Sequence, residues 1–215
     1  MRGDHIIVLP GGGYHGHAAH EAEPIAEWLQ HLGVDSSVFR YPVQTRHPAV
    51  LDAIRAEVRR VRSAGARRVG LLGFSAGGHA AGHAALAPGA STEERVDLAI
   101  LCYPVVSMLL ETHAGSRGNL IGLDASAELR AATSLDQLVA PGAPPFFIWH
   151  TAEDAAVPVQ HSYLLGMALA AAHVPHALHV FPRGRHGIGV STGEGTAEQW
   201  PQLAAAWLAE EGWRS

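Results

Sequence analysis

Short apolar runs recur along this chain and alternate with segments of helical period. Six of them have the length of a strand: His5 to Leu9, Ser36 to Tyr41, Arg68 to Phe74, Leu98 to Tyr103, Pro145 to His150 and His176 to Phe181. Several of these runs are almost wholly apolar, whereas a strand with one wet face alternates apolar and polar residues. Strands buried on both faces are usually parallel. The pattern therefore predicts a mostly parallel sheet of about six strands, covered on both sides.

Segments with an apolar stripe at helical spacing lie between most of these runs. From Glu21 to Leu32 the stripe contains Ile25 and Leu29, and from Val50 to Ser63 it lies opposite Arg and Glu side chains. Residues 76–87, 159–173 and 199–210 have the same helical character. Alternating strands and helices predict a layered α/β fold. The length of 215 residues suits a single domain, residues 1–215.

One region interrupts this alternation. Residues 104–143 contain no clear strand and have scattered Gly, Ser and Asn. A segment of that length without an element of the sheet is usually functional in a compact domain. We interpret it as a short lid-like insertion or pocket wall.

Composition excludes several classes of function. The net charge of -5 gives no electrostatic basis for binding nucleic acid or an anionic membrane. All 15 basic residues are arginine, which excludes Schiff-base chemistry and a phosphate loop that ends in Gly-Lys. The single cysteine, Cys102, has no partner for an internal disulfide.

The sequence also bears on location. No apolar stretch approaches the roughly 20 residues that a membrane-spanning helix needs. The first residues lack the shape of a signal peptide, because Asp4 comes early and Pro10 interrupts the apolar run. We therefore expect a soluble, cytoplasmic protein.

A G-x-S-x-G sequence, Gly73 to Gly77, follows the third apolar run and precedes a helical segment. Such a strand–turn–helix lifts the serine hydroxyl above the end of a parallel sheet, where it can attack an ester or amide carbonyl. The alternative is a tight turn that happens to contain a serine. Ser75 is the candidate nucleophile.

A serine nucleophile needs a base, and the base needs an orienting carboxylate. Asp154 follows the fifth apolar run, and His186 lies on a loop after the sixth. Because the carboxyl ends of parallel strands meet at one edge of a sheet, both side chains should lie near Ser75. Glu153 competes with Asp154 for the carboxylate role, but Asp154 stands in the pattern Asp-x-x-Val-Pro and is preferred.

A developing oxyanion needs amide donors. Ala76, directly after the nucleophile, supplies one N–H, and we expect Gly12 and Gly13 to supply the other, because they follow the first strand. These glycines do not form the G-x-G-x-x-G spacing of a dinucleotide site. Tyr14 and His15 are candidate pocket residues, and no cofactor is expected.

Histidine is abundant, and two groups suggest zinc at first sight. His15, His17 and His20 form H-x-H-x-x-H, and His79 and His83 stand four residues apart on one expected helix. Ala80 occupies the position where a zinc-protease helix has glutamate, and no third ligand is evident. We expect no metal site. The first three histidines should border the pocket, and the other two should pack behind the nucleophile.

The chain resembles the α/β-hydrolase superfamily, and within it the small bacterial acetyl-xylan-esterase-like serine esterases. The resemblance rests on these segments, which span nearly the whole chain: Leu9 to Tyr14, Glu21 to Leu29, Leu72 to His79, Trp149 to Asp154 with Val157-Pro158, and His179 to Pro182 with His186-Gly187. The order Ser, acid, His is also that of the superfamily. In one departure, Pro10 stands where the H-G-G-G lipases have histidine.

The resemblance implies a serine esterase that hydrolyses short-acyl esters, such as an O-acetylated oligosaccharide of the xylan type. Two other functions stay open: a serine peptidase of the prolyl-oligopeptidase type, and a non-catalytic ligand-binding module on the same fold. The short sheet also leaves an edge that a second copy in a homodimer could cover.

Overall fold

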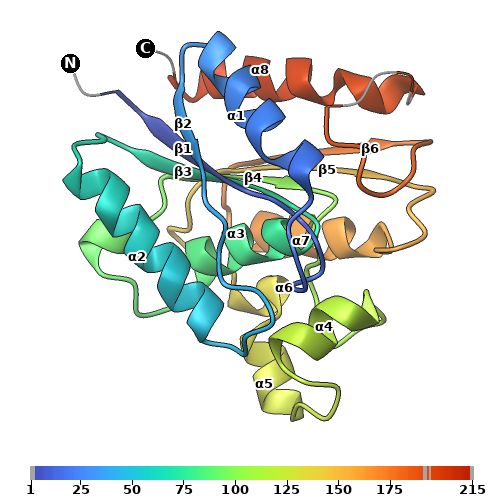
Figure 1. Ribbon diagram of the computed structural model, residues 1–215. Coiled ribbons are helices and arrows are strands. Elements are labelled where there is room, and N and C mark those ends of the chain that lie inside the picture. The colour runs from blue at the N-terminus through green and yellow to red at the C-terminus, as the bar shows by residue number, and fades with distance from the viewer. Residues whose placement is uncertain (1–2, 191–192, 194, 214–215) are drawn as a thin grey trace.

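Six parallel strands form one sheet at the centre of the molecule (Figure 1). The computed structural model describes residues 3–190, 193 and 195–213. The strand order is β2-β1-β3-β4-β5-β6, and all five pairings are parallel. The strands are β1 (His5–Leu9), β2 (Asp35–Val38), β3 (Val69–Phe74), β4 (Leu98–Cys102), β5 (Phe146–Thr151) and β6 (His176–Phe181). The predicted parallel sheet is confirmed.

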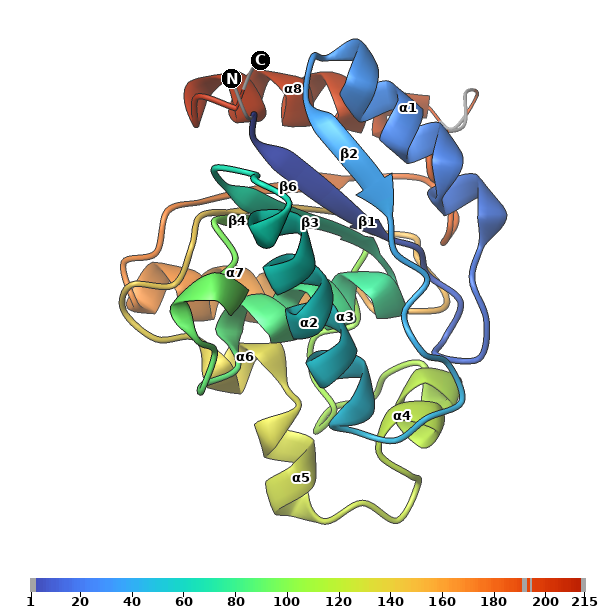
Figure 2. The ribbon, with the colours of Figure 1, turned by 60° about the vertical axis from the view of Figure 1, so that its left-hand side comes forward.

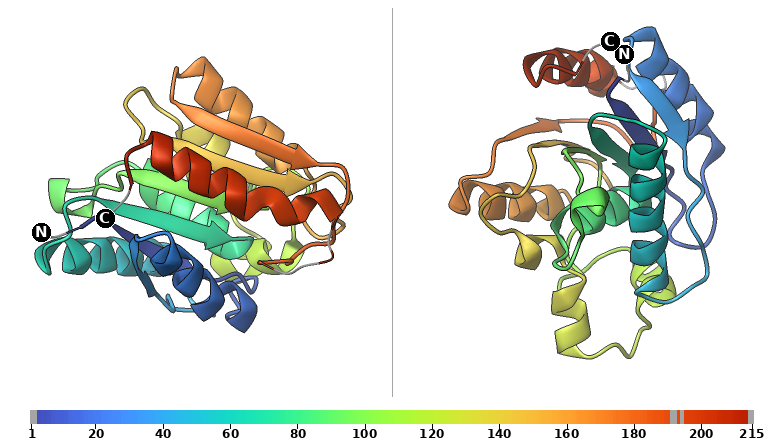
Figure 3. Two further views of the ribbon diagram at one scale, coloured as in Figure 1. Left: turned by 90° about the horizontal axis from the view of Figure 1, so that it is seen from above. Right: turned by 90° about the vertical axis from the view of Figure 1, so that its left-hand side faces the viewer.

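Helices cover both faces of the sheet. On one face lie α1 (Glu23–His31) and α8 (Trp200–Glu210), and on the other lie α2 (Ala49–Ser63), α3 (Ala76–Leu86) and α7 (Gln160–Ala171) (Figures 1 and 3). Seen from above, α8 runs across the sheet with α1 beside it (Figure 3). The layered arrangement predicted from the alternating pattern is therefore confirmed.

Successive residues of β1 enter two different cores. Ile6 and Val8 pack with α1 and α8, whereas Ile7 and Leu9 pack with α2 and α3. All four side chains are fully buried. Burying an aliphatic side chain contributes about 1.5–3 kcal/mol, so an apolar residue at every strand position stabilises both layers. This explains why the sequence shows continuous apolar runs.

Residues 104–143 contain three short helices and no strand. They are α4 (Ala114–Leu120), α5 (Ala127–Ala132) and α6 (Leu135–Leu138). In Figure 2, α4 and α5 lie at the periphery, beyond the layer formed by α2 and α3. Short 3-10 helices cover Ala19–Glu21 (η1), Thr92–Glu94 (η2) and Gly195–Gln199 (η3). Within the described ranges, no helix combines the length and the apolar character that crossing a membrane requires.

Several element boundaries differ from the sequence prediction, by three residues or fewer. Strand β2 ends at Val38 rather than Tyr41, because the chain leaves the sheet there and the Tyr41 hydroxyl donates to Pro10 O at 2.7 Å. Helix α1 begins at Glu23 rather than Glu21, with Pro24 in its first turn, where proline is favoured. Glu21 therefore lies before the helix, in η1.

Candidate active site

Ser75 lies on a strained turn between β3 and α3. Its backbone has φ 52° and ψ −116°, an uncommon conformation for a residue other than glycine. A Cβ on Gly73 would lie 2.1 Å from Gly77 O, and a Cβ on Gly77 would lie 2.1 Å from Leu9 O. Only glycine therefore fits at either side of Ser75, which is the physical content of the G-x-S-x-G pattern.

The structure brings Ser75, His186 and Asp154 together, as the sequence predicts. His186 Nε2 lies 2.8 Å from Ser75 Oγ, and His186 Nδ1 lies 2.6 Å from Asp154 Oδ2. A carboxylate accepts, so Nδ1 carries the proton and donates to it. Nε2 is then free to accept the hydroxyl proton of Ser75. The side chain of Asp154 is fully buried and that of His186 is 22% exposed.

Asp154 is held by more than His186. Its Oδ1 accepts hydrogen bonds from the backbone N–H groups of Ala156 and Val157, both at 2.9 Å. Burial raises the pKa of this carboxyl, but hydrogen bonds from His150 and His186 and from the Val157 amide outweigh burial and hold the pKa below its ordinary value. Asp154 is therefore a charged group fixed beneath the imidazole.

His150 is a second histidine against Asp154, and the sequence prediction did not include it. Its Nε2 lies 3.2 Å from Asp154 Oδ2 and 3.0 Å from Val157 O, and its Nδ1 lies 2.8 Å from Ser162 Oγ. Because a carbonyl only accepts, Nε2 is the donor and Nδ1 accepts from the serine. Its position at the end of β5, where sites in parallel sheets form, was a signal that could have found it.

The loop after β1, residues 10–16, lies beside Ser75. Gly12 has φ 132°, and a Cβ there would lie 2.3 Å from Gly16 O. Gly13 also has a positive φ, of 64°. Within the described part of the chain, the amides of Gly12, Gly13 and Ala76 donate no hydrogen bond to the protein, whereas the Gly11 amide donates to Glu21 Oε2 at 2.9 Å. Three amides expected to hold an oxyanion are thus available.

The two expected pocket residues lie in different environments. Tyr14 is 1% exposed, and its hydroxyl lies 2.6 Å from His79 Nδ1 in the core. Its ring therefore packs beneath the loop, unlike the position expected for a residue that lines a pocket. His15 is exposed on the same loop, and its backbone O accepts from Gln44 Nε2 at 3.2 Å.

The histidines that suggest a metal are used in packing and hydrogen bonding. Nε2 of His79 donates to Thr133 O at 2.7 Å, and burial lowers its pKa to about 4. The neighbouring His83 ring lies 5.6 Å away between centroids. His17 packs against Tyr41, and His20 Nε2 lies 2.9 Å from Gly187 O. Across residues 3–190, 193 and 195–213, no three His, Cys, Asp or Glu side chains cluster as metal ligands.

Two further residues near the site were missed in the sequence. Glu21 and Tyr103 are buried, and the Tyr103 hydroxyl donates to Glu21 Oε1 at 2.6 Å. The Tyr103 ring also packs edge-on against His186, with centroids 4.9 Å apart. Glu21 begins a segment of the family resemblance, but an acidic residue near a helix start is common, so the sequence alone assigned it no role. Tyr103, directly after β4, stood at a strand end.

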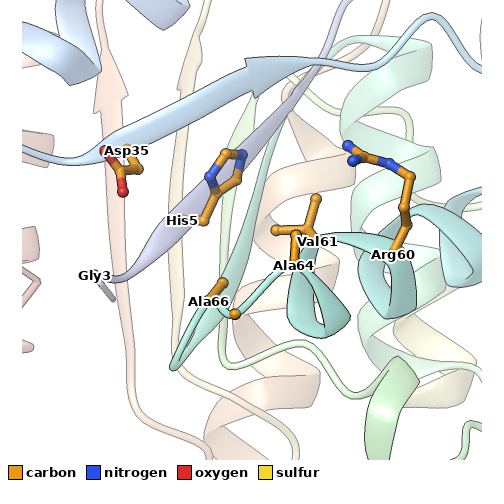
Figure 4. A pocket seen from close by; sticks show the side chains of 8 residues that line it. Gly3, His5, Asp35, Arg60, Val61, Ala64 and Ala66 are labelled. Carbon is orange, nitrogen blue, oxygen red and sulfur yellow. The ribbon is translucent and has the colours of Figure 1, made fainter. Parts of the chain in front are cut away.

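A separate hollow of about 350 Å³ lies at the opposite end of the strands (Figure 4). His5 and Asp35, the first residues of β1 and β2, line it together with Arg60 of α2. Because the serine, the histidine and the carboxylate all lie at the carboxyl ends of the strands, this hollow is not part of the candidate active site.

Comparison with known proteins identifies the family. Residues 49–211, most of the chain, match the model of the prolyl oligopeptidase family. This chain belongs to the prolyl oligopeptidase family. Its closely similar solved structures include an acetyl ester-xyloside bifunctional hydrolase from Caldicellulosiruptor lactoaceticus, with a TM-score of 0.94 and 37% identity over 100% of this chain and 85% of that one. The predicted α/β-hydrolase fold is confirmed.

Curated relatives of this prolyl oligopeptidase family member include an acetylxylan esterase and an endo-1,4-beta-xylanase. The acetylxylan esterase of Xylanibacter ruminicola is 30% identical over 94% of this chain and 45% of its own length. Endo-1,4-beta-xylanase B of Butyrivibrio fibrisolvens is 34% identical over 90% of this chain and 34% of its own. The chain thus spans less than half of either relative. The resemblance to small bacterial acetyl-xylan esterases is confirmed.

Proposed function

We propose that this chain is a serine esterase that removes short acyl groups, acetyl above all, from the hydroxyls of xylan-type oligosaccharides. The observation that carries the proposal is the continuous hydrogen-bond chain from Ser75 Oγ through His186 to Asp154, with distances of 2.8 and 2.6 Å. This geometry suits attack by a serine hydroxyl on a carbonyl carbon.

The reaction runs in two halves. His186 Nε2 takes the Ser75 proton as Oγ attacks the acyl carbon, and then returns that proton to the departing sugar oxygen. The acyl group is left on Ser75. A water molecule, deprotonated by His186, attacks that ester, and the acid leaves as Ser75 recovers its proton. Asp154 holds the imidazole in the required tautomer and stabilises it while it is protonated.

Two amides stabilise the oxyanion that forms in each half. The Ala76 N–H is one donor, and a Gly12 or Gly13 N–H is the other. The hydrogen bond from the Gly11 amide to Glu21 supports this assignment, because it leaves Gly11 unable to donate to substrate.

The segment 104–143 forms a wall of the acyl pocket in this proposal. Asn119 Nδ2 donates to Gly13 O at 2.9 Å, and a Cβ on Gly13 would lie 3.4 Å from the His113 ring. Both residues belong to α4 or its N-cap, so this segment packs directly on the loop that should hold the oxyanion. A wall this close favours a short acyl chain.

A panel of substrates tests the proposal. Wild-type protein should hydrolyse p-nitrophenyl acetate faster than p-nitrophenyl decanoate, and it should release acetate from acetylated xylo-oligosaccharides. It should leave p-nitrophenyl β-xyloside intact, because most glycosidases use a pair of carboxyl groups flanking the bond, and Asp154 is instead hydrogen-bonded to His186. Faster turnover of the decanoate would contradict the acyl preference, and cleavage of the xyloside alone would contradict the esterase assignment.

A peptidase is the second candidate function, because the matching family model is that of the prolyl oligopeptidases. The same serine, histidine and carboxylate could cleave an amide. A prolyl p-nitroanilide, assayed beside p-nitrophenyl acetate, separates the two functions, and we expect turnover of the ester only. A non-catalytic ligand-binding role would instead leave Ser75 unlabelled by a fluorophosphonate.

A further inference from the structure

Glu21 carries a buried carboxylate that forms no ion pair with an arginine among the residues that the structure describes. The residue is 2% exposed, and the ion pair found for it in the described ranges is with His20, at 3.8 Å. The chain contains no lysine. Burying a carboxylate is unfavourable unless hydrogen bonds replace its hydration. Such a residue therefore calls for a physical explanation.

The two oxygens of Glu21 hold two different loops of the site. Oε2 accepts the Gly11 N–H at 2.9 Å, in the loop that precedes Gly12 and Gly13. Oε1 accepts the Tyr103 hydroxyl at 2.6 Å. The Tyr103 oxygen in turn accepts the Gly189 N–H at 3.0 Å, on the loop that carries His186. Glu21 and Tyr103 thus form a bridge from the oxyanion loop to the histidine loop.

Packing around the bridge leaves it little freedom. A Cβ on Gly11 would lie 2.6 Å from Glu21 Oε2 and 3.2 Å from Ser75 Cβ, so the carboxylate lies close behind the nucleophile. On the other side, a Cβ on Gly187 would lie 3.9 Å from Glu21 Oε1. Glu21 is therefore enclosed between the two loops.

Tyr103 is itself held in a strained conformation. Its φ is 37°, a value that is unfavourable for a residue other than glycine. Its N–H donates to Trp149 O at 2.7 Å, and its ring is 1% exposed and packs against His186. The surrounding structure maintains this conformation, which aims the hydroxyl at Glu21.

We propose that Glu21 and Tyr103 are positioning residues that fix the oxyanion donors and the His186 base relative to each other. The inference rests on the proposed esterase function. Because Glu21 holds the Gly11 amide and Tyr103 holds the Gly189 amide, a shift of either loop strains the other. The bridge thereby keeps the oxyanion donors and the His186 imidazole correctly placed around one acyl carbon.

Glutamine cannot reproduce the bridge, although it has the same shape. A carboxylate accepts on both oxygens, whereas an amide offers one acceptor and one NH₂ donor. With the NH₂ towards Gly11, two donors face each other. With the NH₂ towards Tyr103, the tyrosine hydroxyl loses its acceptor. Either arrangement leaves a buried donor unsatisfied and displaces a loop.

The test compares Glu21→Gln, Tyr103→Phe and the double variant with wild type. Rates of p-nitrophenyl acetate hydrolysis are divided by the concentration of serine that a fluorophosphonate titrates, so that unfolded protein does not count. Each single variant should lose about tenfold in kcat with little change in KM, because misplaced donors weaken transition-state binding. The double variant should lose less than the product of the two single losses, because both remove one bridge.

Asp4→Asn is the matched control. Asp4 is another buried carboxylate and directly precedes β1. It pairs with Arg67 and Arg68, at the end of the sheet opposite the candidate active site. Asp4→Asn should lower stability and keep the wild-type kcat per titrated serine. If Glu21→Gln does not fold, Tyr103→Phe, which removes one oxygen atom, carries the same expectation.

The outcomes separate the two proposals. Wild-type kcat per titrated serine in both single variants would overturn the positioning role while leaving the esterase function intact. A loss that multiplies fully in the double variant would overturn the bridge as a unit. Wild-type protein that the fluorophosphonate does not label at Ser75 would overturn the esterase function, and the inference with it.

Discussion

Asp154 is the residue on which the hydrogen bonds of the site converge. Two backbone amides hold one of its oxygens, and His186 holds the other, with His150 Nε2 at 3.2 Å. Its carboxyl pKa lies below the ordinary 3.8, because hydrogen bonds to the charged form outweigh burial. A carboxyl with a lowered pKa stabilises the fold at pH values above its ordinary pKa. That stabilisation is lost as the pH falls from the ordinary pKa through the lowered pKa of the native state.

Asp154→Asn should therefore reduce the free energy of unfolding, by about 2 kcal/mol near pH 7. The difference from wild type should narrow as the pH falls below 3.8, since the Asp154 carboxyl of the unfolded wild-type chain then takes up a proton while the native carboxylate stays charged. Urea unfolding at pH 7 and at pH 3 measures both values. Asp124→Asn, which changes an exposed carboxylate, is the control and should have little effect. An equal loss at both pH values would contradict this account.

At the residue scale, the sequence revealed those site residues that stand in a recognisable motif or directly after a predicted strand. Ser75, Asp154 and His186 follow three strands in the expected order, and the structure places them in contact. Neither Glu21 nor Tyr103 stands in a catalytic motif, and their importance depends on a contact between residues 82 positions apart. Tyr14 was expected near substrate because of its place in the glycine loop. Its ring instead fills the core beneath that loop, where His79 Nδ1 accepts a hydrogen bond from its hydroxyl.

At the scale of elements, the turn from β3 to α3 depends on close contact with β1. The Gly77 Cα faces the Leu9 carbonyl so closely that no side chain fits between them. The strand positions were predictable, because strands buried on both faces leave continuous apolar runs. The end of β2 was not predictable. The Tyr41 hydroxyl, just beyond that strand, donates to Pro10 O, a contact between distant parts of the chain.

Gly77→Ala should lower the free energy of unfolding by about 1–3 kcal/mol, because the added Cβ would lie 2.1 Å from Leu9 O. It should also reduce esterase activity per folded molecule, since relief of the clash moves Ser75. Thermal unfolding and p-nitrophenyl acetate hydrolysis measure the two effects. Gly3→Ala is the matched control, because its Cβ would make an ordinary 3.5 Å contact. Wild-type stability in Gly77→Ala would show that the strand and helix separate easily.

At the scale of the whole molecule, parallel strands bring distant loops to one edge of the sheet. The glycine loop, the nucleophile turn, the carboxylate turn and the histidine loop follow β1, β3, β5 and β6. That convergence was predictable from the alternation of strands and helices. The contact of residues 104–143 with the glycine loop was not, since it rests on single side chains such as Asn119.

In the proposed mechanism, Ser75 carries the acyl group during turnover. Wild-type protein mixed with p-nitrophenyl acetate, quenched in acid and digested, should yield an acetylated peptide that contains Ser75. Ser75→Ala should yield none, and its kcat should fall on the order of 10⁵- to 10⁶-fold. Hydrolysis by Ser75→Ala at the wild-type rate, or acetyl groups trapped on another residue in the wild type, would contradict the account.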